Sequence, residues 1–581
     1  MLRSRWIVRP LHSGPQRQRG VSSVIVALFA GLVMVALGAI DIGNLFYARR
    51  SLQRVADLAA LAAVQTLDDT CTQPPLTARA NADANGFSAT AQGQSLDLAC
   101  GRWDTSENNG PSYFSSASGQ APLNAVQVTA TRPVPYIFFG PARTISASAT
   151  AQATNLGAFT VGTALAQLQG GLVNALLNAL LGGSVNLSLA SYESLANARV
   201  KLGDLAAALG VSTVDQLLAA RVSAAGLAQL MLTALSNTSV ADANLQTDLA
   251  TLQAIVAGGM SNAISFPIGD SSDAHGLLSL GLADSQSALD ATISPFDALM
   301  VAAQIAKAGQ PPIDVSAGVQ LPGADLSLLL QIIEPPVLAV GEAGIDPATR
   351  NWRTMAHTAQ LRLYMNIGLS LPPLPLIGQV ALELPISLEA VPGNAWLESI
   401  SCASSKPASR STIGATPGLA NICIAKRPAN LAASQPFSCS QPATLVDVPN
   451  LIEVTAALPL TATVGPADSP SLSFDGVSGN DDDYQSADSN AVGGILANAL
   501  TGLATSLAQP GALSIRLFGL PSSLLDSLTG ALVSLLSTLL SPVLIALDAV
   551  VEPLLQLLGV QIGVAEIHDL SLTCGVSKLV Y

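Results

Sequence analysis

The longest apolar pattern in the chain lies near its beginning. No residue from Gly20 to Ile40 carries a charge, and 21–40 is an almost continuous apolar run. A helix needs about 20 such residues to cross the ~30 Å hydrocarbon core of a bilayer. The pattern therefore predicts a transmembrane helix over 20–40, which would contact the lipid bilayer through residues 21–40.

An amphipathic pattern follows this span without an intervening proline. Apolar residues recur at helical spacing across 45–67, and Arg50, Gln53 and Asp57 are among the polar residues between them. Pro74 and Pro75 then make a natural stop. The pattern predicts that the helix continues over 41–70.

Beyond residue 70 the pattern changes several times. It predicts a small disulfide-closed α+β module over 71–155, a Leu/Ala-rich helical region over 156–310, a β-rich region with a cysteine-stapled loop over 311–470, a flexible acidic loop over 471–490, and amphipathic helices with a terminal strand over 491–581. The expected fold class is α+β, with an N-terminal transmembrane helix followed by mixed helical and β-rich periplasmic domains.

Local signals place some of these elements more closely. Gly210 followed by residues 212–215 predicts the end of one helix and the N-cap of the next. Pro385 favours a position at the edge of a sheet for the strand that contains it. Alternation of apolar and polar residues predicts strands over 125–131, 144–153, 361–367 and 380–389.

Residues 528–547 form a second long run without charge, so a second membrane span has to be weighed. Pro542 and several Ser and Thr side chains interrupt this run, and Asp548 follows it directly. The apolar residues also form one stripe with the hydroxyl side chains opposite. The pattern favours a buried amphipathic helix over a second span.

The charges beside the first span predict its orientation. The preceding tail, residues 1–19, contains several arginines and no acidic residue. Positive residues next to a span are retained in the cytoplasm. We therefore expect a single-pass protein of the bacterial inner membrane, with a basic cytoplasmic tail over 1–19 and a periplasmic body.

Two other interpretations of the span remain open at this stage. A cleaved secretory signal would use a small-residue site such as Ala36–Gly38, although its apolar region would be shorter. A type IV prepilin leader would be cut after Gly20, but such proteins usually carry Glu at the fifth position, where this chain has Ile25. Whether Gly20 is a cleavage site is left open.

Charge excludes one class of partner. The chain of 581 residues has a net charge of −14, and only 11% of its residues are charged. Residues 1–54 contain eight Arg and one Asp, a net +7, so the remaining chain carries −21. Phosphate binding needs clustered Lys and Arg, so this acidic body is not expected to bind nucleic acid.

The cysteines indicate an oxidising compartment. All of them follow the span, their number is even, and no two have the CxxC spacing of a metal or redox site. Cys71 with Cys100 is the preferred pair, because both fall in one small segment, and the other four allow three connectivities. The disulfide candidates are Cys71, Cys100, Cys402, Cys423, Cys439 and Cys574.

No familiar catalytic pattern is present, since GxSxG, GxxxxGK[ST], HExxH and GxGxxG are all absent. Glu566, His568 and Asp569 are the densest group of ligand-like residues, and we interpret them as a solvated turn at a strand end. The acidic run 481–483 is interpreted as a hydrated loop rather than a calcium site. The sequence thus predicts no enzymatic activity, no cofactor, no metal and no small-molecule substrate.

The segment RGVSSVIVALFAGLVMVALGAIDIGNLFYARRSLQRVADLAALAAVQTL resembles the N-terminal segment of TadG-like proteins of the Flp (tight-adherence) pilus-assembly system. In that family an apolar span runs into an Asp and then an LQxAADxAALAA pattern, and here Val55 replaces one Ala. The region from Cys100 to Asp104 is similar to the region that follows the anchor in this family. The matching motif residues include Asp41, Leu52, Gln53, Asp57, Ala60 and Ala63.

The resemblance implies a membrane-anchored, non-enzymatic component of Flp pilus assembly or anchoring. Such a protein would act by contact with other pilus-assembly or envelope proteins in the periplasm. Small residues of the span, Ala27, Ala30, Gly31 and Gly38, would allow close packing against other anchors. The metal-binding DxSxS of some relatives is absent. A surface-exposed adhesion or binding module is the alternative.

Overall fold

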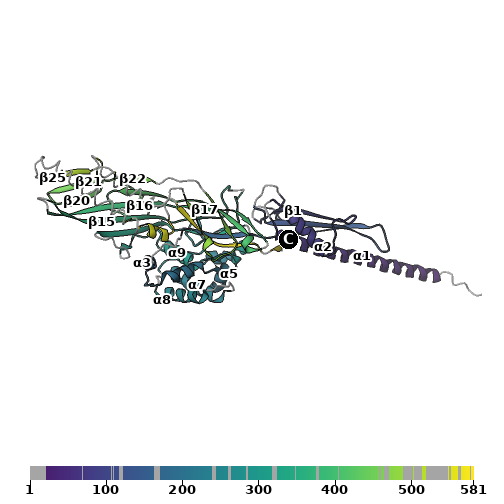
Figure 1. Ribbon diagram of the computed structural model, residues 1–581. Coiled ribbons are helices and arrows are strands. Elements are labelled where there is room, and N and C mark those ends of the chain that lie inside the picture. The colour runs from purple at the N-terminus through teal and green to yellow at the C-terminus, as the bar shows by residue number, and fades with distance from the viewer. Residues whose placement is uncertain are drawn as a thin grey trace, which may run out of the picture.

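The protein is elongated, with a projecting helix at one end and a β-rich body at the other (Figure 1). This computed structural model describes residues 21–580 except 68–69, 106–107, 109, 111, 117–121, 163–169, 239–243, 260–262, 283–284, 317–323, 347–348, 375–377, 404, 457–459, 464–469, 489–501, 503–504, 506–508, 510–512, 519–546, 548–550, 561–563 and 576. Helices and strands both contribute about a third of the chain, so the α+β class is confirmed.

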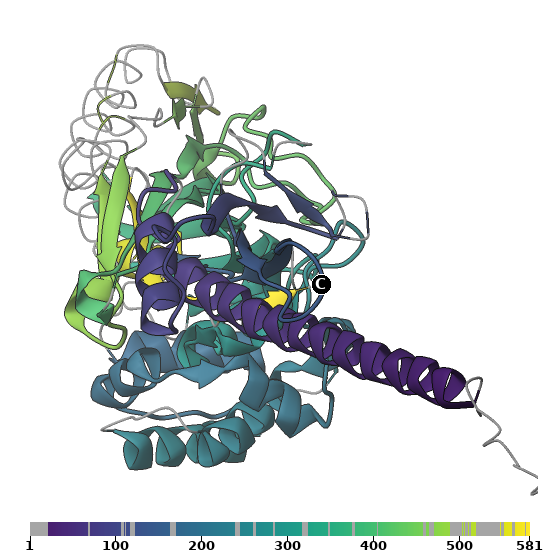
Figure 2. The same ribbon diagram turned by 90° about the vertical axis from the view of Figure 1, so that its right-hand side faces the viewer.

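Helix α1 (Val21–Val64) joins the predicted span and the predicted continuing helix in one element of 44 residues. It is long and apolar enough to cross a membrane. Its first half projects from the rest of the molecule, and its second half packs on a sheet (Figure 2). The helix ends before the stop expected near residue 70.

The sheet that covers α1 belongs to a small N-terminal module, which also contains α2 (Pro74–Ala84). The predicted strands over 125–131 and 144–153 are present in β3 and β4. A strand from the end of the chain, β27, pairs with β4 and completes the sheet, so the C-terminus lies beside the N-terminal module (Figure 1). The strand order is β2 (Phe114–Ser115), β1 (Ser95–Trp103), β3 (Ala125–Val134), β4 (Arg143–Gln152), β27 (Lys578–Val580).

The body is built around a central sheet whose two faces meet different layers. One face packs on a second sheet, and their shared core includes Phe159, Leu397 and Phe474. The central order is β24 (Tyr484–Asp488), β26 (Val564–Thr573), β5 (Leu156–Val161), β13 (Leu338–Gly341), β9 (Leu278–Gly281). The second order is β14 (Met355–His357), β17 (Asn394–Ser401), β18 (Arg410–Thr416), β23 (Ser471–Asp475).

Helices form the layer on the other side of the body (Figure 1). Every residue of α9 (Pro295–Ile305) is buried, so this helix is the centre of the layer. As predicted, one helix ends at Gly210, which has a left-handed conformation, and Thr213 caps the next one. The remaining helices are α3 (Gly170–Leu181), α4 (Leu189–Asn197), α5 (Leu202–Leu209), α6 (Val214–Ala219), α7 (Ala224–Asn237) and α8 (Leu245–Ala257).

Short strands and one 3-10 helix connect these helices. They are the pairs β6 (Val200–Lys201) with β10 (Thr292–Ile293) and β7 (Arg221–Ser223) with β8 (Ser265–Pro267), and η1 (Ser285–Asp290).

A long antiparallel sheet extends the body away from α1 and shares a core with the helices (Figure 1). Its order is β11 (Ile313–Asp314), β12 (Asp325–Glu334), β15 (Gln360–Leu374), β16 (Gly378–Val391), β19 (Leu419–Ile424), β22 (Leu460–Thr463). A smaller sheet, β20 (Thr444–Val448), β21 (Ile452–Ala456), β25 (Leu513–Leu517), lies beside it. The described part of the chain also contains two 3-10 helices, η3 (Lys406–Ala408) and η4 (Asp481–Asp483).

Several predicted boundaries are wrong. The helical region of 156–310 begins with the strand β5, whose residues are all buried and therefore lack the alternation of a half-exposed strand. The acidic loop of 471–490 contains β23 and β24 instead. In 491–581, β25 lies where helices were expected, because pairing with β21 overrides local propensity.

Two predictions about the β-rich region also need correction. The cysteine-stapled loop expected within 311–470 is partly strand, because β18 and β19 lie between Cys402 and Cys439. Pro385 does not place its strand at an edge, because β16 lies between β15 and β19. The ladder with β19 begins only at Ile386, so the missing N–H of Pro385 falls outside it. The amphipathic helix predicted over 528–547 lies, apart from the buried Leu547, outside the described residues.

Candidate functional site

The second half of α1 packs across β3 and β4 through small and aliphatic side chains. Because apolar residues recur every three or four positions, they form one stripe along the helix. The alanines in this stripe let the helix lie close to the sheet, where it meets Val126, Val128 and Ala149. The buried stripe consists of Leu52, Val55, Ala56, Ala59, Ala60, Ala63 and Val64.

Asp41 joins α1 to the turn between β3 and β4. Its side-chain oxygens accept hydrogen bonds from the backbone N–H groups of Ile137 at 2.7 Å, Phe138 at 3.2 Å and Phe139 at 2.9 Å. Three consecutive N–H groups around one carboxylate form a strong anion-binding arrangement. Asp41 is 3% exposed, so the apolar run of the span ends at a residue held inside the protein.

Further contacts hold the hairpin formed by β3 and β4 against α1. The side-chain amide of Gln53 donates to the carbonyl of Ser148 at 2.9 Å and to the carboxylate of Asp57 at 2.8 Å. Arg132 donates to the carbonyl of Ala48 at 3.3 Å. The motif residues singled out in the sequence thus lie together on one surface of α1, at its contact with β3 and β4 or directly beside it.

The first half of α1 has no such cover. Its large apolar side chains are exposed, and those of Phe29, Leu32 and Val35 are each about 70% exposed. A side chain at Gly31 or Gly38 would meet nothing within 4 Å. This end of the helix therefore offers a bare apolar surface to a surrounding membrane or to other helices.

Three disulfides are present, and they account for all six cysteines. Cys71–Cys100, the pair preferred from the sequence, ties the segment after α1 to β1. Of the connectivities left open for the other four, the structure has Cys402–Cys574 and Cys423–Cys439. Cys402–Cys574 tethers the end of β17 to the segment between β26 and β27.

A buried ion pair links the N-terminal module to the body. Arg102 of β1 is 0% exposed and donates to Glu342, which directly follows β13, at 2.6 Å. The same guanidinium lies 3.3 Å from Asp104 and donates to the carbonyl of Pro122 at 3.1 Å. Asn124 also donates to Glu342, at 3.4 Å. Opposite charges buried this closely stabilise each other only while both are present.

A second polar cluster lies in the centre of the body. His568 and Asp569 are each 1% exposed, so their interpretation as a solvated turn is wrong. Asp483, expected in a hydrated loop, is also buried and lies 2.9 Å from Arg199. The ring of Tyr484 stacks on His568 with centroids 4.0 Å apart. Tertiary packing of β24 and β26 puts these side chains inside the protein.

The hydrogen bonds of His568 define its state. Arg199 can only donate, so Nε2 of His568 accepts from it at 3.1 Å, and Nδ1–H donates to Asp297 at 2.6 Å. Burial lowers the pKa of His568 below 6.5, although Asp297 opposes this shift, which agrees with a neutral ring. With both nitrogens engaged and the ring enclosed, the histidine is placed to stabilise the core rather than to transfer protons.

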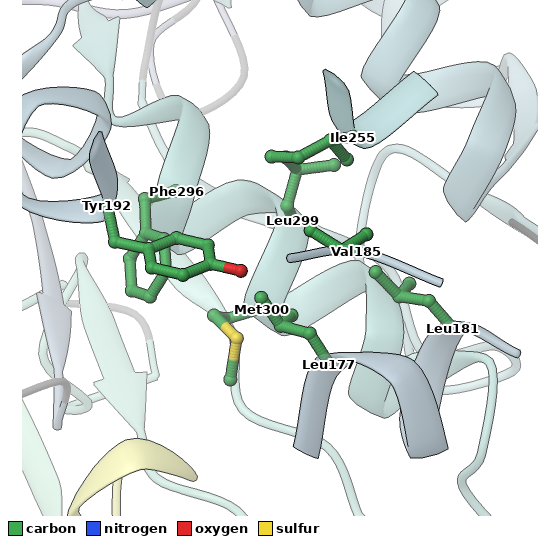
Figure 3. Close-up of a pocket in the computed structure, with 8 residues that line it drawn as sticks. All are labelled: Leu177, Leu181, Val185, Tyr192, Ile255, Phe296, Leu299 and Met300. Carbon is green, nitrogen blue, oxygen red and sulfur yellow. The ribbon is translucent and has the colours of Figure 1, made fainter. Parts of the chain in front are cut away.

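The helical layer contains a small apolar cavity of about 10 Å³. Figure 3 shows that the side chains around it come from several helices and from Val185, and that all of them are apolar apart from the hydroxyl of Tyr192. Such a volume is about that of one water molecule. It is a packing gap, too small for a substrate. Among the described residues, no group of three or more His, Cys, Asp or Glu could hold a metal ion.

Replacing Asp569 with asparagine is expected to stabilise the protein increasingly as the pH rises. Burial first, and the charge of Asp483 second, raise the pKa of Asp569 well above 3.8, and neither carboxylate oxygen has a hydrogen-bond partner in the described part of the chain. The protonated carboxyl therefore favours folding at about pH 4 and below, and this contribution is lost as the pH rises. Asparagine stays neutral, so we expect a gain of about 1–3 kcal/mol near pH 7 in urea titrations.

The exposed Asp482 offers a control for this experiment, because Asp482→Asn makes the same change at the surface. It should alter the free energy of unfolding little at any pH. A gain for Asp569→Asn that was equal at about pH 4 and pH 7 would contradict the explanation.

Three family models match the chain. Residues 20–66 match "Putative Flp pilus-assembly TadE/G-like", and residues 62–153 match "Putative Tad-like Flp pilus-assembly". Residues 169–304, mostly the helical layer, match "Domain of unknown function (DUF8293)". No curated protein and no solved structure matches the chain. The matches confirm the resemblance of the N-terminal region to TadG-like proteins and support a role in Flp pilus assembly.

Proposed function

We propose that this protein, whose N-terminal region is that of a TadG-like Flp pilus-assembly protein, is a single-pass component of the bacterial inner membrane that works without catalysis. Its N-terminus would lie in the cytoplasm and its body in the periplasm. It would act by contact with other pilus-assembly or envelope proteins.

The observation that carries this proposal is the joint between α1 and the hairpin. Asp41 and Gln53 bind the hairpin at two levels of the helix, which lie about 18 Å apart at 1.5 Å per residue. The span is therefore a rigid continuation of the module instead of a tether. A force or a contact at the body would be transmitted to the membrane helix, as an anchoring component requires.

Within the membrane, one face of the span is suited to helix packing. Ala27, Gly31 and Gly38 fall within about 40° of each other at 3.6 residues per turn. Small residues let helices approach closely, which is the main source of attraction between helices in lipid. We propose that another membrane anchor packs on this face.

Replacing Ala27 with leucine is expected to reduce copurification of other pilus-assembly proteins with this chain from detergent-solubilised membranes. The added side chain would separate the packed helices. Ala36 lies about 180° around the helix from Ala27, so Ala36→Leu makes an identical change on the opposite face and should leave copurification intact. Equal effects of both variants would contradict packing on this face.

Protease treatment of intact cells separates the proposal from the alternative of a surface adhesion module. A periplasmic body is protected until the outer membrane is permeabilised, whereas a surface module is cleaved at once. Cleavage beyond residue 100 in intact cells, with a periplasmic marker protein still protected, would rule out the periplasmic assembly function.

A further inference from the structure

The turn between β3 and β4, residues 135–142, has an unusual surface. Ile137, Phe138 and Phe139 are 59%, 47% and 43% exposed, and these three large apolar side chains are consecutive. Hairpin turns at a water-exposed surface are normally polar. We refer to residues 135–142 as the hairpin tip, and we propose that it inserts into the interfacial layer of the bilayer beside the span. This inference rests on the proposed membrane anchoring of α1.

The position of the hairpin tip along α1 is the first argument. Asp41 binds the tip and directly follows the apolar run of 21–40. Asn44, one turn further on, donates to the carbonyl of Pro135 at 3.4 Å. When 21–40 occupies the hydrocarbon core, the tip must therefore lie at the boundary between hydrocarbon and headgroups.

The chemistry of the hairpin tip suits that boundary. Aromatic side chains concentrate at membrane interfaces, where an apolar ring can meet the upper acyl chains. Phe46 and Tyr47 of α1 are also exposed, by 66% and 75%, a short distance beyond the tip. Arg143 is exposed at the start of β4 and is placed to meet lipid phosphates.

The bonds to Asp41 remove the main obstacle to insertion. Backbone N–H groups without a partner are costly where water is scarce, and a bare carboxylate is costlier still. Here the N–H groups of 137–139 and the carboxylate satisfy each other. The tip therefore presents side chains to the lipid with the N–H groups of 137–139 and the carbonyl of Pro135 already paired.

The partner of the hairpin tip is the lipid bilayer, because the apolar surface of the tip continues that of the span. Ile40 and Ile42, on either side of Asp41, are 50% and 55% exposed. Asp41, which separates them in the sequence, is only 3% exposed and so adds little polar surface between the span and the tip. A second copy of the chain or another protein would not need this alignment with the end of the span.

Site-directed spin labelling tests the insertion in the full-length chain, reconstituted into vesicles of phosphatidylcholine and phosphatidylglycerol. All native cysteines are in disulfides, so a single new cysteine can be labelled. A nitroxide at Phe138→Cys should show a ratio of oxygen to nickel-chelate collisions several-fold above that at Ser148→Cys, which lies level with Gln53. A nitroxide at Leu32→Cys reports whether the span is in hydrocarbon.

The possible outcomes separate the two proposals. A label at 138 that matches the label at 148, with 32 in hydrocarbon, would overturn insertion of the hairpin tip alone. A label at 32 that reports water would overturn the membrane anchor itself. A label at 138 shielded from both oxygen and nickel would show that protein covers the tip, which also overturns the inference.

The Asp41 contact provides a second test. Asp41→Asn keeps the size of the side chain but removes the charge that binds the N–H groups of 137–139. The collision ratio at 138 should then fall toward the value at 148. Asp83→Asn, the same change at an exposed position of α2 away from the hairpin tip, should leave the ratio unchanged.

Discussion

Replacing Arg102 with methionine is expected to lower the free energy of unfolding by about 3–5 kcal/mol. Arg102 is fully buried, and its guanidinium neutralises Glu342 across the joint between the N-terminal module and the body. Methionine fills a similar space but leaves Glu342 and Asp104 as buried carboxylates without that partner. Urea titration of the full-length protein in detergent, followed by circular dichroism, measures the change.

A double-mutant cycle shows whether the loss comes from the stranded charge. Glu342→Gln removes the negative charge while keeping an acceptor for Asn124. The pair Arg102→Met with Glu342→Gln should therefore be more stable than the sum of the single changes predicts, by about 1–3 kcal/mol. Strictly additive effects would show that the ion pair is not what holds this joint.

Removing the disulfide Cys402–Cys574 by changing both residues to serine is the second large effect we expect. The two cysteines are 172 residues apart, so the bond closes a long loop of the unfolded chain. The chain-entropy relation gives a loss of about 5 kcal/mol for such a loop. We expect β27, which pairs with β4 through only three residues, to detach first.

Cys423–Cys439 is the internal control for this prediction, because its cysteines are only 16 residues apart. The same relation gives about 3 kcal/mol for a loop of this size. Urea titrations of the two double-serine variants should therefore rank Cys402–Cys574 as the costlier loss. The reverse order would mean that loop closure does not control the contribution of these bonds.

Both predictions concern the attachment of the body to the N-terminal module, which carries α1. Arg102 pairs β1 of the module with Glu342 of the body. The Cys402–Cys574 bond fixes to the body the segment that leads to β27, which belongs to the sheet of the module. If either attachment fails, the body can turn relative to α1. For an anchoring protein such freedom would weaken the transmission of force between the membrane and its partners.

Sequence reasoning worked where structure depends on near neighbours. The uncharged run 21–40 and the spacing of Leu52, Ala56 and Ala63 predicted α1, because helical periodicity depends only on residues three or four apart. Gly210 and Thr213 marked a helix end and a helix start for the same reason.

Sequence reasoning failed for residues whose burial depends on a partner far away in the chain. Asp483 lies in an acidic, polar segment, which is typical of a solvated loop, yet its partner Arg199 is 284 residues away. His568 is likewise buried, and both of its ring nitrogens have distant partners: Nδ1–H donates to Asp297, and Nε2 accepts from Arg199. Local composition contains no signal for such pairs, since many acidic residues compete for each arginine.

The sequence by itself determined the long apolar helix α1, the preferred pair Cys71–Cys100 and the family motif of the N-terminal region. Only the tertiary structure decided that Asp41 binds the hairpin tip, that Arg102 meets Glu342, and that β27 closes the first sheet. The physical reason is the entropy lost when residues that are distant in the chain are brought together. Local patterns stabilise a helix or a strand wherever it occurs, whereas a contact across hundreds of residues forms only when the packing of everything between them brings its partners together.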